Sequence, residues 1–177
     1  KQDLKEMFEI IFVDICGPLT ETKGRKKYIL GIIDQYSKYQ VLTAITKQDE
    51  ESIKKTILEK WILRFGCPKE IRVDCGKAFE SGMMREFTKM LDIKLCFSSP
   101  YHHQTNGQIE RQFRTIRDLI NATLQDRKKT DWAEILPEVE FTLNATKQKT
   151  TGKSPAEIVF GQKVRREKWY GSKKPVK

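Results

Sequence analysis

The sequence predicts an α/β protein, a mixed five-stranded sheet flanked by helices, and three observations lead to that fold class. First, three short segments rich in β-branched and aromatic residues come early, at residues 8–13, 28–33 and 39–44, and their close spacing favours an antiparallel meander. Second, helical and strand patterns then alternate up to residue 97. Third, the rest of the chain is mainly helical in pattern. Strands first and alternation afterwards indicate helices packed on the faces of one mixed sheet.

The alternating part starts with a helix over residues 49–65, because its apolar residues recur at helical spacing. Trp61 lies on that apolar stripe, so we expect it in the core rather than at a ligand. The Gly66-Cys67-Pro68 segment ends the helix. The elements expected next are a strand at residues 70–73, a helix over about 80–91 and a strand at 93–97.

Three further helices are predicted in the second half of the chain. A long helix from residue 108 to about 126 carries one apolar stripe. Asp131 with Glu134 three residues later predicts a capping box for the next helix, and Pro137 predicts a kink or break inside it. Ser154-Pro155 opens a short last helix that Gly161 closes. The stripe of the long helix consists of Ile109, Phe113, Ile116, Ile120 and Leu124.

Length and charge constrain the organisation of the chain. The 177 residues suffice for one domain, which we expect over residues 1–161, with a basic carboxy-terminal extension over 162–177. The net charge is +10, and residues 147–177 alone hold ten Lys or Arg against two Glu. A basic segment of this kind favours a polyanion partner such as nucleic acid, and a solvated tail that only aids solubility explains the charge equally well.

Several classes of protein are excluded by what the sequence lacks. No apolar run reaches the roughly 18 residues that a membrane span needs, and no apolar targeting stretch opens the chain, so we expect no membrane association. The four cysteines form no Cys-x-x-Cys pair, and His102 and His103 are adjacent. We therefore expect no structural zinc, no disulfide framework, and reduced cysteines.

Three carboxylates stand where predicted elements begin or end. Asp14 ends the first strand, Asp74 follows the fourth, and Glu110 lies in the first turn of the long helix, with 35 residues between it and Asp74. Each alone has a structural explanation, as a turn former, an Asx-turn residue and a helix-dipole partner respectively. Together they suit phosphoryl transfer with two divalent ions, because hard carboxylate oxygens bind Mg²⁺ and converging strands and a helix bring them to one pocket.

At these residues the chain resembles the catalytic cores of retroviral and retrotransposon integrases, the Ty3/gypsy type above all. The motifs that carry the resemblance are DICGPL at 14–19, VDCGKAF at 73–79 and YHHQTNGQIER at 101–111. DQYSKY at 34–39 and TGKSPA at 151–156 are also similar to that family. The resemblance extends over residues 8–161.

The resemblance implies an RNase H-like fold with Asp14, Asp74 and Glu110 as the catalytic, metal-binding triad. It implies two Mg²⁺ or Mn²⁺ ions, trimming of the 3′ ends of element DNA and their transfer to target DNA. It also implies a homodimer in the nucleus, or partly in the cytoplasm, and leaves room for a host protein partner. The residues expected to bind DNA are Asn106, Gln108, Arg111, Arg114 and Arg117.

Two alternatives stay open. Phe113 stands where the family usually has Asn, and the family's amino-terminal zinc module is absent from this sequence, so we expect a catalytic-core segment or a host protein that keeps only the core. A domesticated, non-catalytic scaffold that binds nucleic acid or protein is the main alternative. A ribonuclease acting on RNA–DNA hybrids is the second, although the QTNGQIER block argues against it.

Overall fold

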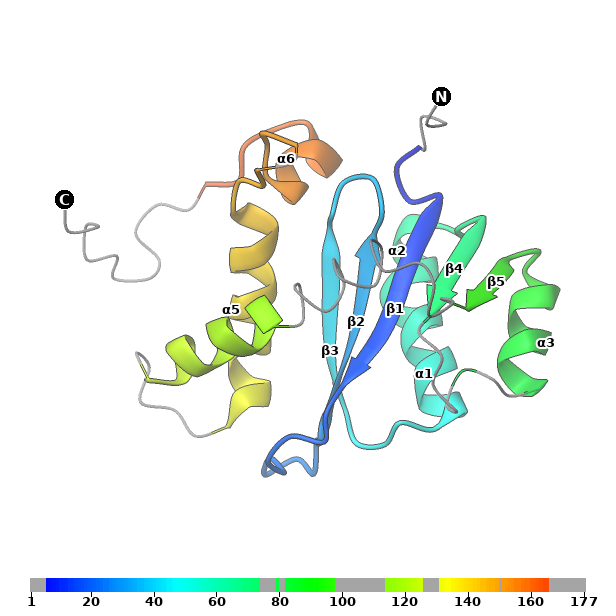
Figure 1. The fold of residues 1–177 in the computed structure, drawn as a ribbon, viewed down its shortest axis with the longest axis horizontal. Helices are drawn as coiled ribbons and strands as arrows, with labels where there is room; N and C mark the ends of the chain where they lie inside the picture. The colour runs from blue at the N-terminus through cyan, green and yellow to red at the C-terminus, as the bar shows by residue number, and fades with distance from the viewer. Residues whose placement is uncertain are drawn as a thin grey trace.

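A computed structural model describes residues 6–73, 79, 82–97, 114–125, 131–149 and 151–165 of the chain. Its centre is a five-stranded sheet with helices on both faces (Figure 1). The mixed five-stranded sheet predicted from the sequence is confirmed. In spatial order the strands are β3 (Gln40–Ile45), β2 (Tyr28–Asp34), β1 (Ile10–Cys16), β4 (Glu70–Val73) and β5 (Lys94–Phe97).

Strand β1 is the middle strand of the sheet. It pairs antiparallel with β2, which pairs antiparallel with β3, so the predicted meander is confirmed. On its other side β1 pairs parallel with β4, and β4 pairs parallel with β5. The register sets Asp14 opposite Gly31 of β2 and Val13 opposite Val73 of β4. A side chain on β1 is therefore supported by neighbouring strands on both sides.

The first strand differs from its predicted bounds of residues 8–13. It starts later because Phe8 has a φ of 66°, in the left-handed region that interrupts extended backbone. It ends later because Asp14 and Cys16 still pair with β2. The prediction that Asp14 ends the strand as part of a turn is therefore wrong: Asp14 lies within β1, and the turn comes only after Cys16.

One face of the sheet is covered by the segment that the sequence predicted as a single helix over 49–65. The structure divides it into α1 (Glu50–Ile57), a π-helical turn η1 (Leu58–Ile62) and a last turn α2 (Leu63–Phe65). Asp49 caps its start by accepting the N–H of Ser52 at 2.9 Å. Trp61 is fully buried against the sheet, as predicted. Helix α3 (Gly82–Met90), which the sequence placed over about 80–91, packs on the same side (Figure 1).

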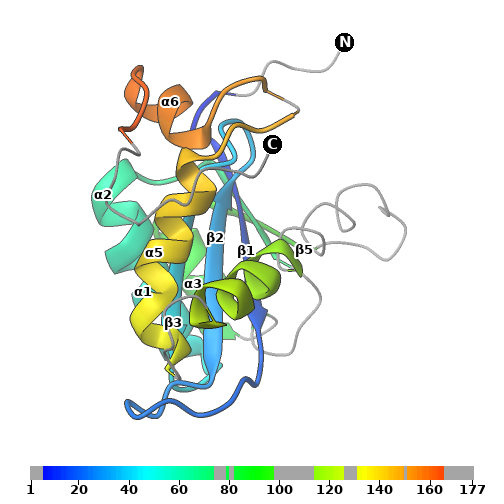
Figure 2. The same cartoon turned by 90° about the vertical axis from the view of Figure 1, so that its left-hand side faces the viewer.

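The opposite face is covered by α5 (Trp132–Ala145) and by a helix over residues 114–125, both in front of the sheet in Figure 2. The buried residues of these two helices pack on the sheet residues that face them. Full burial of one isoleucine, leucine or valine side chain contributes about 1.5–3 kcal/mol to the stability of the fold. The sheet contributes Cys16, Ile29 and Leu42 to this second core, and the helices contribute Ile116, Ile120, Trp132, Ile135, Leu136, Val139 and Leu143.

Helix α5 begins as the sequence predicted. Asp131 is its N-cap and accepts the N–H of Ala133 at 3.0 Å. Of the kink or break expected at Pro137, the break is wrong, because α5 continues through Pro137 to Ala145. Residues on both sides of the proline, among them Ile135 and Val139, are buried on the sheet, and this packing compensates for the missing backbone N–H.

Side chains of α5 also bind the outer edge of β3. Asn144 accepts the backbone N–H of Gln40 at 2.9 Å and donates to the carbonyl of Gln40 at 2.7 Å. Glu140 accepts the N–H of Leu42 at 2.6 Å. Strand β3 is the last strand on its side of the sheet, so α5 provides the hydrogen bonds that a further strand would otherwise make.

Helix α6 (Pro155–Phe160) follows the predicted bounds. The Ser154 hydroxyl accepts the N–H of Glu157 at 3.2 Å, and Gly161, at φ 71°, closes the helix in the left-handed conformation. In the part of the chain that the structure describes, no helix is long and apolar enough to cross a bilayer. The three cysteines of that part, Cys16, Cys67 and Cys96, are free thiols.

Candidate active site

Asp14 lies on the middle strand and faces the layer formed by α5 and the helix over 114–125. Successive side chains of a strand alternate between faces, and Cys16, two residues further on, packs in the core of that layer. Asp14 is half-buried, and one carboxylate oxygen accepts the N–H of Ile15 at 2.8 Å. A partly buried carboxylate held by its own strand is well placed to bind a cation or to take part in catalysis.

Gly31 of β2 lies beside Asp14. The two residues are directly opposite in the antiparallel β1–β2 pair, so a side chain at residue 31 would emerge on the same face as the Asp14 carboxylate. Gly31 is buried and carries no Cβ. The next position across the sheet, Leu42 of β3, lies in the core beneath α5. On the β2 side, Asp14 therefore faces a residue that presents only backbone.

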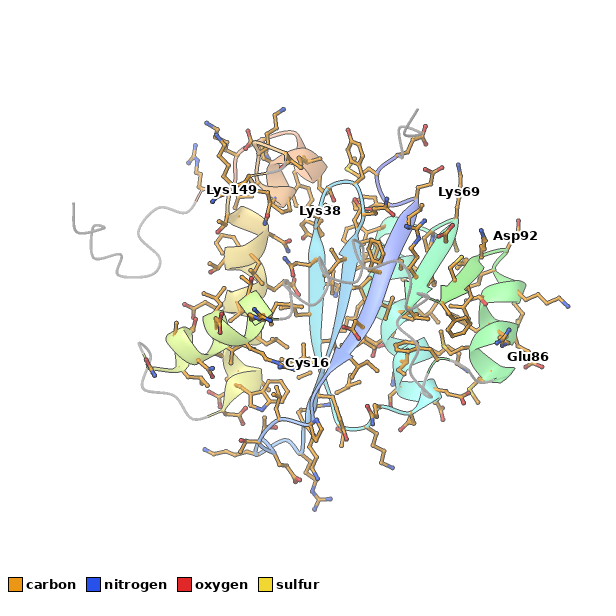
Figure 3. The ribbon with its side chains drawn as sticks, viewed as in Figure 1. Cys16, Lys38, Lys69, Glu86, Asp92 and Lys149 are labelled. Carbon is orange, nitrogen blue, oxygen red and sulfur yellow. The ribbon has the colours of Figure 1, made fainter. Side chains whose placement is uncertain are left out.

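The helix over 114–125 brings a basic side chain to the same face. Ile116 and Ile120 anchor this helix in the second core. Arg117, on its exposed side, donates its Nε–H to the Sγ of Cys16 at 3.0 Å. Because Cys16 is two residues from Asp14 on one face of β1, this contact places the Arg117 guanidinium on the Asp14 side of the sheet. Figure 3 labels Cys16 near the end of β1.

The loop that follows β1 is fixed to the start of α5. The indole N–H of Trp132 donates to the carbonyl of Thr20 at 2.7 Å, and the backbone N–H of Lys23 donates to the Asp131 carboxylate at 3.2 Å. Asp131 thus both caps α5 and holds this loop. These bonds join the strand that carries Asp14 to the helical layer above it.

Several predicted site residues lie outside the described residues. They are Asp74, Glu110, Asn106, Gln108 and Arg111. Of the predicted DNA-binding residues the structure describes Arg114 and Arg117, both exposed on the helix over 114–125. Within the described residues, no group of three or more His, Cys, Asp or Glu side chains is close enough to hold a metal ion.

The DQYSKY motif has a structural role. Asp34 is fully buried at the end of β2 and accepts the N–H of Ser37 at 2.7 Å, the Ser37 hydroxyl at 2.6 Å and the N–H of Phe8 at 2.9 Å. It therefore closes the β2–β3 turn and ties the entry of β1 to it. A buried carboxylate with this many donors stabilises the turn and needs no catalytic explanation.

Sequence comparison decides the family. The profile described as "Integrase core domain" matches residues 5–103, more than half of the chain. The chain belongs to the integrase core family. The matched region contains β1 with Asp14, and the family expected from the motifs is thereby confirmed.

Relatives of this integrase core are found among transposon and retroviral polyproteins. The chain is 31% identical over 155 residues to the retrovirus-related Pol polyprotein from transposon 412 of Drosophila melanogaster. It is 29% identical over 157 residues to the Gag-Pol polyprotein of Walleye dermal sarcoma virus, and 29% over 153 residues to the transposon Tf2-3 polyprotein of Schizosaccharomyces pombe. These matches cover 86–89% of the chain and only 9–12% of the polyproteins, so the chain spans a small part of each relative.

Solved structures show the same fold. The HTLV-2 integrase catalytic core domain in complex with magnesium, in a trimeric form, superposes with a TM-score of 0.70 at 23% identity, over 85% of this chain and 95% of that one. The BIV integrase catalytic core superposes with a TM-score of 0.69 at 21% identity, over 86% and 94%. A simian T-cell lymphotropic virus intasome in complex with PP2A regulatory subunit B56 gamma gives 0.74 at 20%, over 95% and 59%. The RNase H-like fold expected from the resemblance is confirmed.

Two residues of the candidate site have no role in the sequence-based predictions. The position of Gly31 opposite Asp14 depends on the register of β1 and β2, which no local pattern reveals. Cys16 enters the sequence argument only as one of four cysteines and as part of the DICGPL motif, although it is two residues from Asp14 and shares its face. The alternation of side chains along β1 is a sequence signal that would place Cys16 on that face. Its contact with Arg117 joins residues far apart in sequence, so no local pattern reveals it.

Proposed function

We propose that this chain is the catalytic core of an integrase that processes the 3′ ends of element DNA and joins them to target DNA. The observation that carries the proposal is the placement of Asp14 on the middle strand, beside Gly31 and beneath the helix that carries Arg117. The family membership and the shared fold support it. Asp74 and Glu110 complete the proposed catalytic triad.

Strand register supports the pairing of Asp14 with Asp74. Val13 and Val73 are partners in the parallel β1–β4 pair, and each is followed in sequence by one of the two aspartates. Consecutive Cα atoms are about 3.8 Å apart, so the Cα atom of each aspartate is about that far from the Cα atom of a paired valine. For Glu110 the support is helical spacing, because residues seven apart on one helix share a face and Arg117 is seven residues after Glu110.

The residues fit divalent metal ions by the chemistry of their donors. Asp14, Asp74 and Glu110 are carboxylates, the hard oxygen ligands that Mg²⁺ and Mn²⁺ prefer. The Cys16 thiol on this face accepts the Arg117 Nε–H. The chemistry that two bound ions supply is activation of the attacking oxygen and stabilisation of the leaving oxygen. The magnesium in the HTLV-2 structure is consistent with this choice of metal.

Arg114 and Arg117 are proposed to hold the DNA backbone. A guanidinium presents five N–H donors, and the bond from Nε to Cys16 fixes the Arg117 side chain through one of them. The Nη groups of Arg117 then contact phosphate oxygens, which orients the scissile phosphate above Asp14. Asn106, Gln108 and Arg111, in the motif at residues 101–111, are proposed as further DNA contacts. Phosphate contacts of this kind position the substrate without reading its sequence.

Self-association, host partners and a nuclear location are proposed together with this function. The HTLV-2 core was solved in a trimeric form, and the simian intasome was solved with a PP2A regulatory subunit. We propose a homodimer for this chain, with measurement of its mass in solution as the check. DNA as substrate makes the nucleus the expected site of action.

The test is strand transfer or its reversal on branched DNA with Mg²⁺ or Mn²⁺, comparing the wild-type chain with Asp14→Asn. Activity in the wild type and background activity in Asp14→Asn support the proposal. Equal activity in both overturns it and favours the non-catalytic scaffold. Cleavage of an RNA–DNA hybrid by the wild type, without action on branched DNA, would instead identify a ribonuclease.

A further inference from the structure

A hollow lined by lysines lies between the end of α5 and helix α6. Its volume is about 430 Å³, and its charged lining consists of Lys147, Lys153, Lys163 and Glu157. We call it the lysine hollow. The three lysines are exposed, and Ser154 and Ala145 form part of the wall. The lining thus carries two positive charges in excess.

The backbone holds two of the three lysines in place. The N–H of Gln148 donates to the carbonyl of Lys153 at 3.0 Å, and the N–H of Gly152 donates to the carbonyl of Gln148 at 2.9 Å. The Thr151 hydroxyl also donates to the Lys153 carbonyl, at 2.9 Å. These bonds close a short loop with Lys147 at one end and Lys153 at the other. The backbone positions of these two lysines are therefore set by folding, so that binding an anion orders only their side chains.

Within the described part of the chain, the positive charge of this region exceeds the negative charge beside it. Lys149 and Arg165 flank the lysine hollow and bring the number of nearby cations to five. Among the described residues none of the five forms an ion pair, whereas Lys27 and Lys69 elsewhere pair with Glu21 and Glu9. Uncompensated charge concentrated at a concave surface attracts an external anion.

The lysine hollow is separate from the candidate active site. The ring of Phe160 in α6 contacts the ring of Tyr39, with centroids 5.9 Å apart, and Tyr39 closes the turn at the end of the sheet where β1 begins. Asp14 and Cys16 lie toward the end where β1 finishes. Figure 3 shows this separation, with Lys149 labelled beside α6 and Cys16 labelled toward the other end of β1.

We propose that the lysine hollow binds backbone phosphates of duplex DNA, at a site distinct from the one that contains Asp14. Phosphates on a duplex recur at fixed spacing and carry one charge each, which suits several lysines held apart by a closed loop. Lysine ammonium groups contact phosphate as point charges, so the site is insensitive to sequence. The inference rests on the proposed function only in taking DNA as the partner, and it does not require the chain to be catalytically active.

The experiment measures binding of the full chain to a fluorescent duplex of about 20 base pairs without divalent ions, at salt concentrations from about 50 to 200 mM. The variant is Lys147→Gln, Lys153→Gln and Lys163→Gln combined. The matched control is Lys47→Gln, Lys54→Gln and Lys55→Gln, which removes the same charge from the region of α1. Log affinity falls as log salt rises, and the steepness of this fall should decrease by about 3 for the hollow variant, about one for each phosphate that no longer meets a lysine. The control should show little change.

Two outcomes overturn the inference: equal slopes for the hollow variant and the wild type, or equal falls in affinity for the two triple variants. Far-ultraviolet circular dichroism and melting temperatures show that each variant is folded, and the single Lys163→Gln variant serves if the triple variant is not. Asp14→Asn separates the two proposals, because it should bind DNA with the wild-type slope even where it abolishes strand transfer. If strand transfer fails in the wild type while the slopes differ as expected, only the proposed function falls.

Discussion

The Nε of Arg117 lies 3.0 Å from the Sγ of Cys16 and donates a hydrogen bond to it. This contact connects a helix to the middle strand of the sheet, two residues from Asp14. The thiol is buried, so the bond is shielded from water at one end and fixes the direction of an otherwise long and flexible side chain. Arg117 is therefore positioned before any substrate arrives.

Replacing Cys16 with alanine removes the acceptor and should weaken DNA binding through Arg117. We expect KM for DNA to rise several-fold, with a smaller change in kcat. Cys16→Ser, which keeps an acceptor, should restore most of the binding. Arg117→Lys keeps the charge but has no Nε–H, and should behave like Cys16→Ala. Steady-state kinetics on branched DNA measure both parameters. Equal KM values in Cys16→Ala and the wild type would show that the contact does not position Arg117.

Gly31→Val should impair activity more than it impairs folding. The new side chain emerges on the face of the Asp14 carboxylate, directly opposite it in the β1–β2 pair. We expect activity to fall at least tenfold, with Gly31→Ala showing a smaller loss. The control is Ile29→Val, a buried substitution on the same strand and face, which should cost about 0.5–1.5 kcal/mol of stability and leave activity intact. Comparable losses of activity in Gly31→Val and Ile29→Val would contradict the prediction.

Glu140→Gln should alter the pH dependence of stability. Burial raises the pKa of the Glu140 carboxyl above its ordinary 4.5, against the opposing effects of the Leu42 N–H, Arg64 and Lys60. A raised pKa means that the fold favours the protonated form, so stability falls as pH rises from 4.5 through the folded-state pKa. We expect the variant to match the wild type below about pH 4.5 and to be the more stable of the two at pH 7. Chemical denaturation at pH 4 and at pH 7 measures the free energy of unfolding of both proteins. A variant that is less stable than the wild type at pH 7 but equally stable at pH 4 would refute the prediction.

Arg72→Met should have the opposite pH dependence. Burial acts to raise the pKa of Glu70, but the hydrogen bond and charge of Arg72, with Lys94, outweigh it and lower the pKa below 4.5. Stability from this pair is present above pH 4.5 and is lost as pH falls through the folded-state pKa. We expect Arg72→Met to lose about 1–3 kcal/mol at pH 7, because Glu70 is left half-buried without its main partner. The loss should shrink in acid. A loss independent of pH would assign the effect to packing of Arg72 on the Phe12 ring, whose centroid is 5.6 Å from the guanidinium carbon.

Local patterns predict most of the elements correctly. The bounds of β4 and α6 match the prediction, because a β-branched run in one case and Ser-Pro followed by a terminal glycine in the other are signals contained in a few residues. The sequence places the end of β1 too early, because Gly17-Pro18 indicates a turn that starts near Asp14. Pairing with β2 extends the strand to Cys16, and that pairing is a tertiary property.

Features that depend on distant residues are not predictable from the sequence. The π-helical turn at Leu58–Ile62 packs Trp61 against Phe8 and Phe65, and no local signal marks it. The sequence motif identifies Asp14, and the resemblance names Arg117 as a DNA contact. The position of Gly31 opposite Asp14 and the bond from Arg117 to Cys16 follow only from strand register and helix packing. The predictions for Asp74 and Glu110 lie outside the described residues and await the activity test.

The bonds from α5 to β3 have a consequence for assembly. Asn144 and Glu140 occupy the outward N–H groups of Gln40 and Leu42, so this side of the sheet offers no free backbone ladder at those residues. A peptide cannot join there by β-augmentation, and two copies cannot merge their sheets across this strand without first displacing α5. A complex that leaves these bonds intact engages residues 40–42 of this edge through side-chain contacts, which can dissociate without unfolding the sheet.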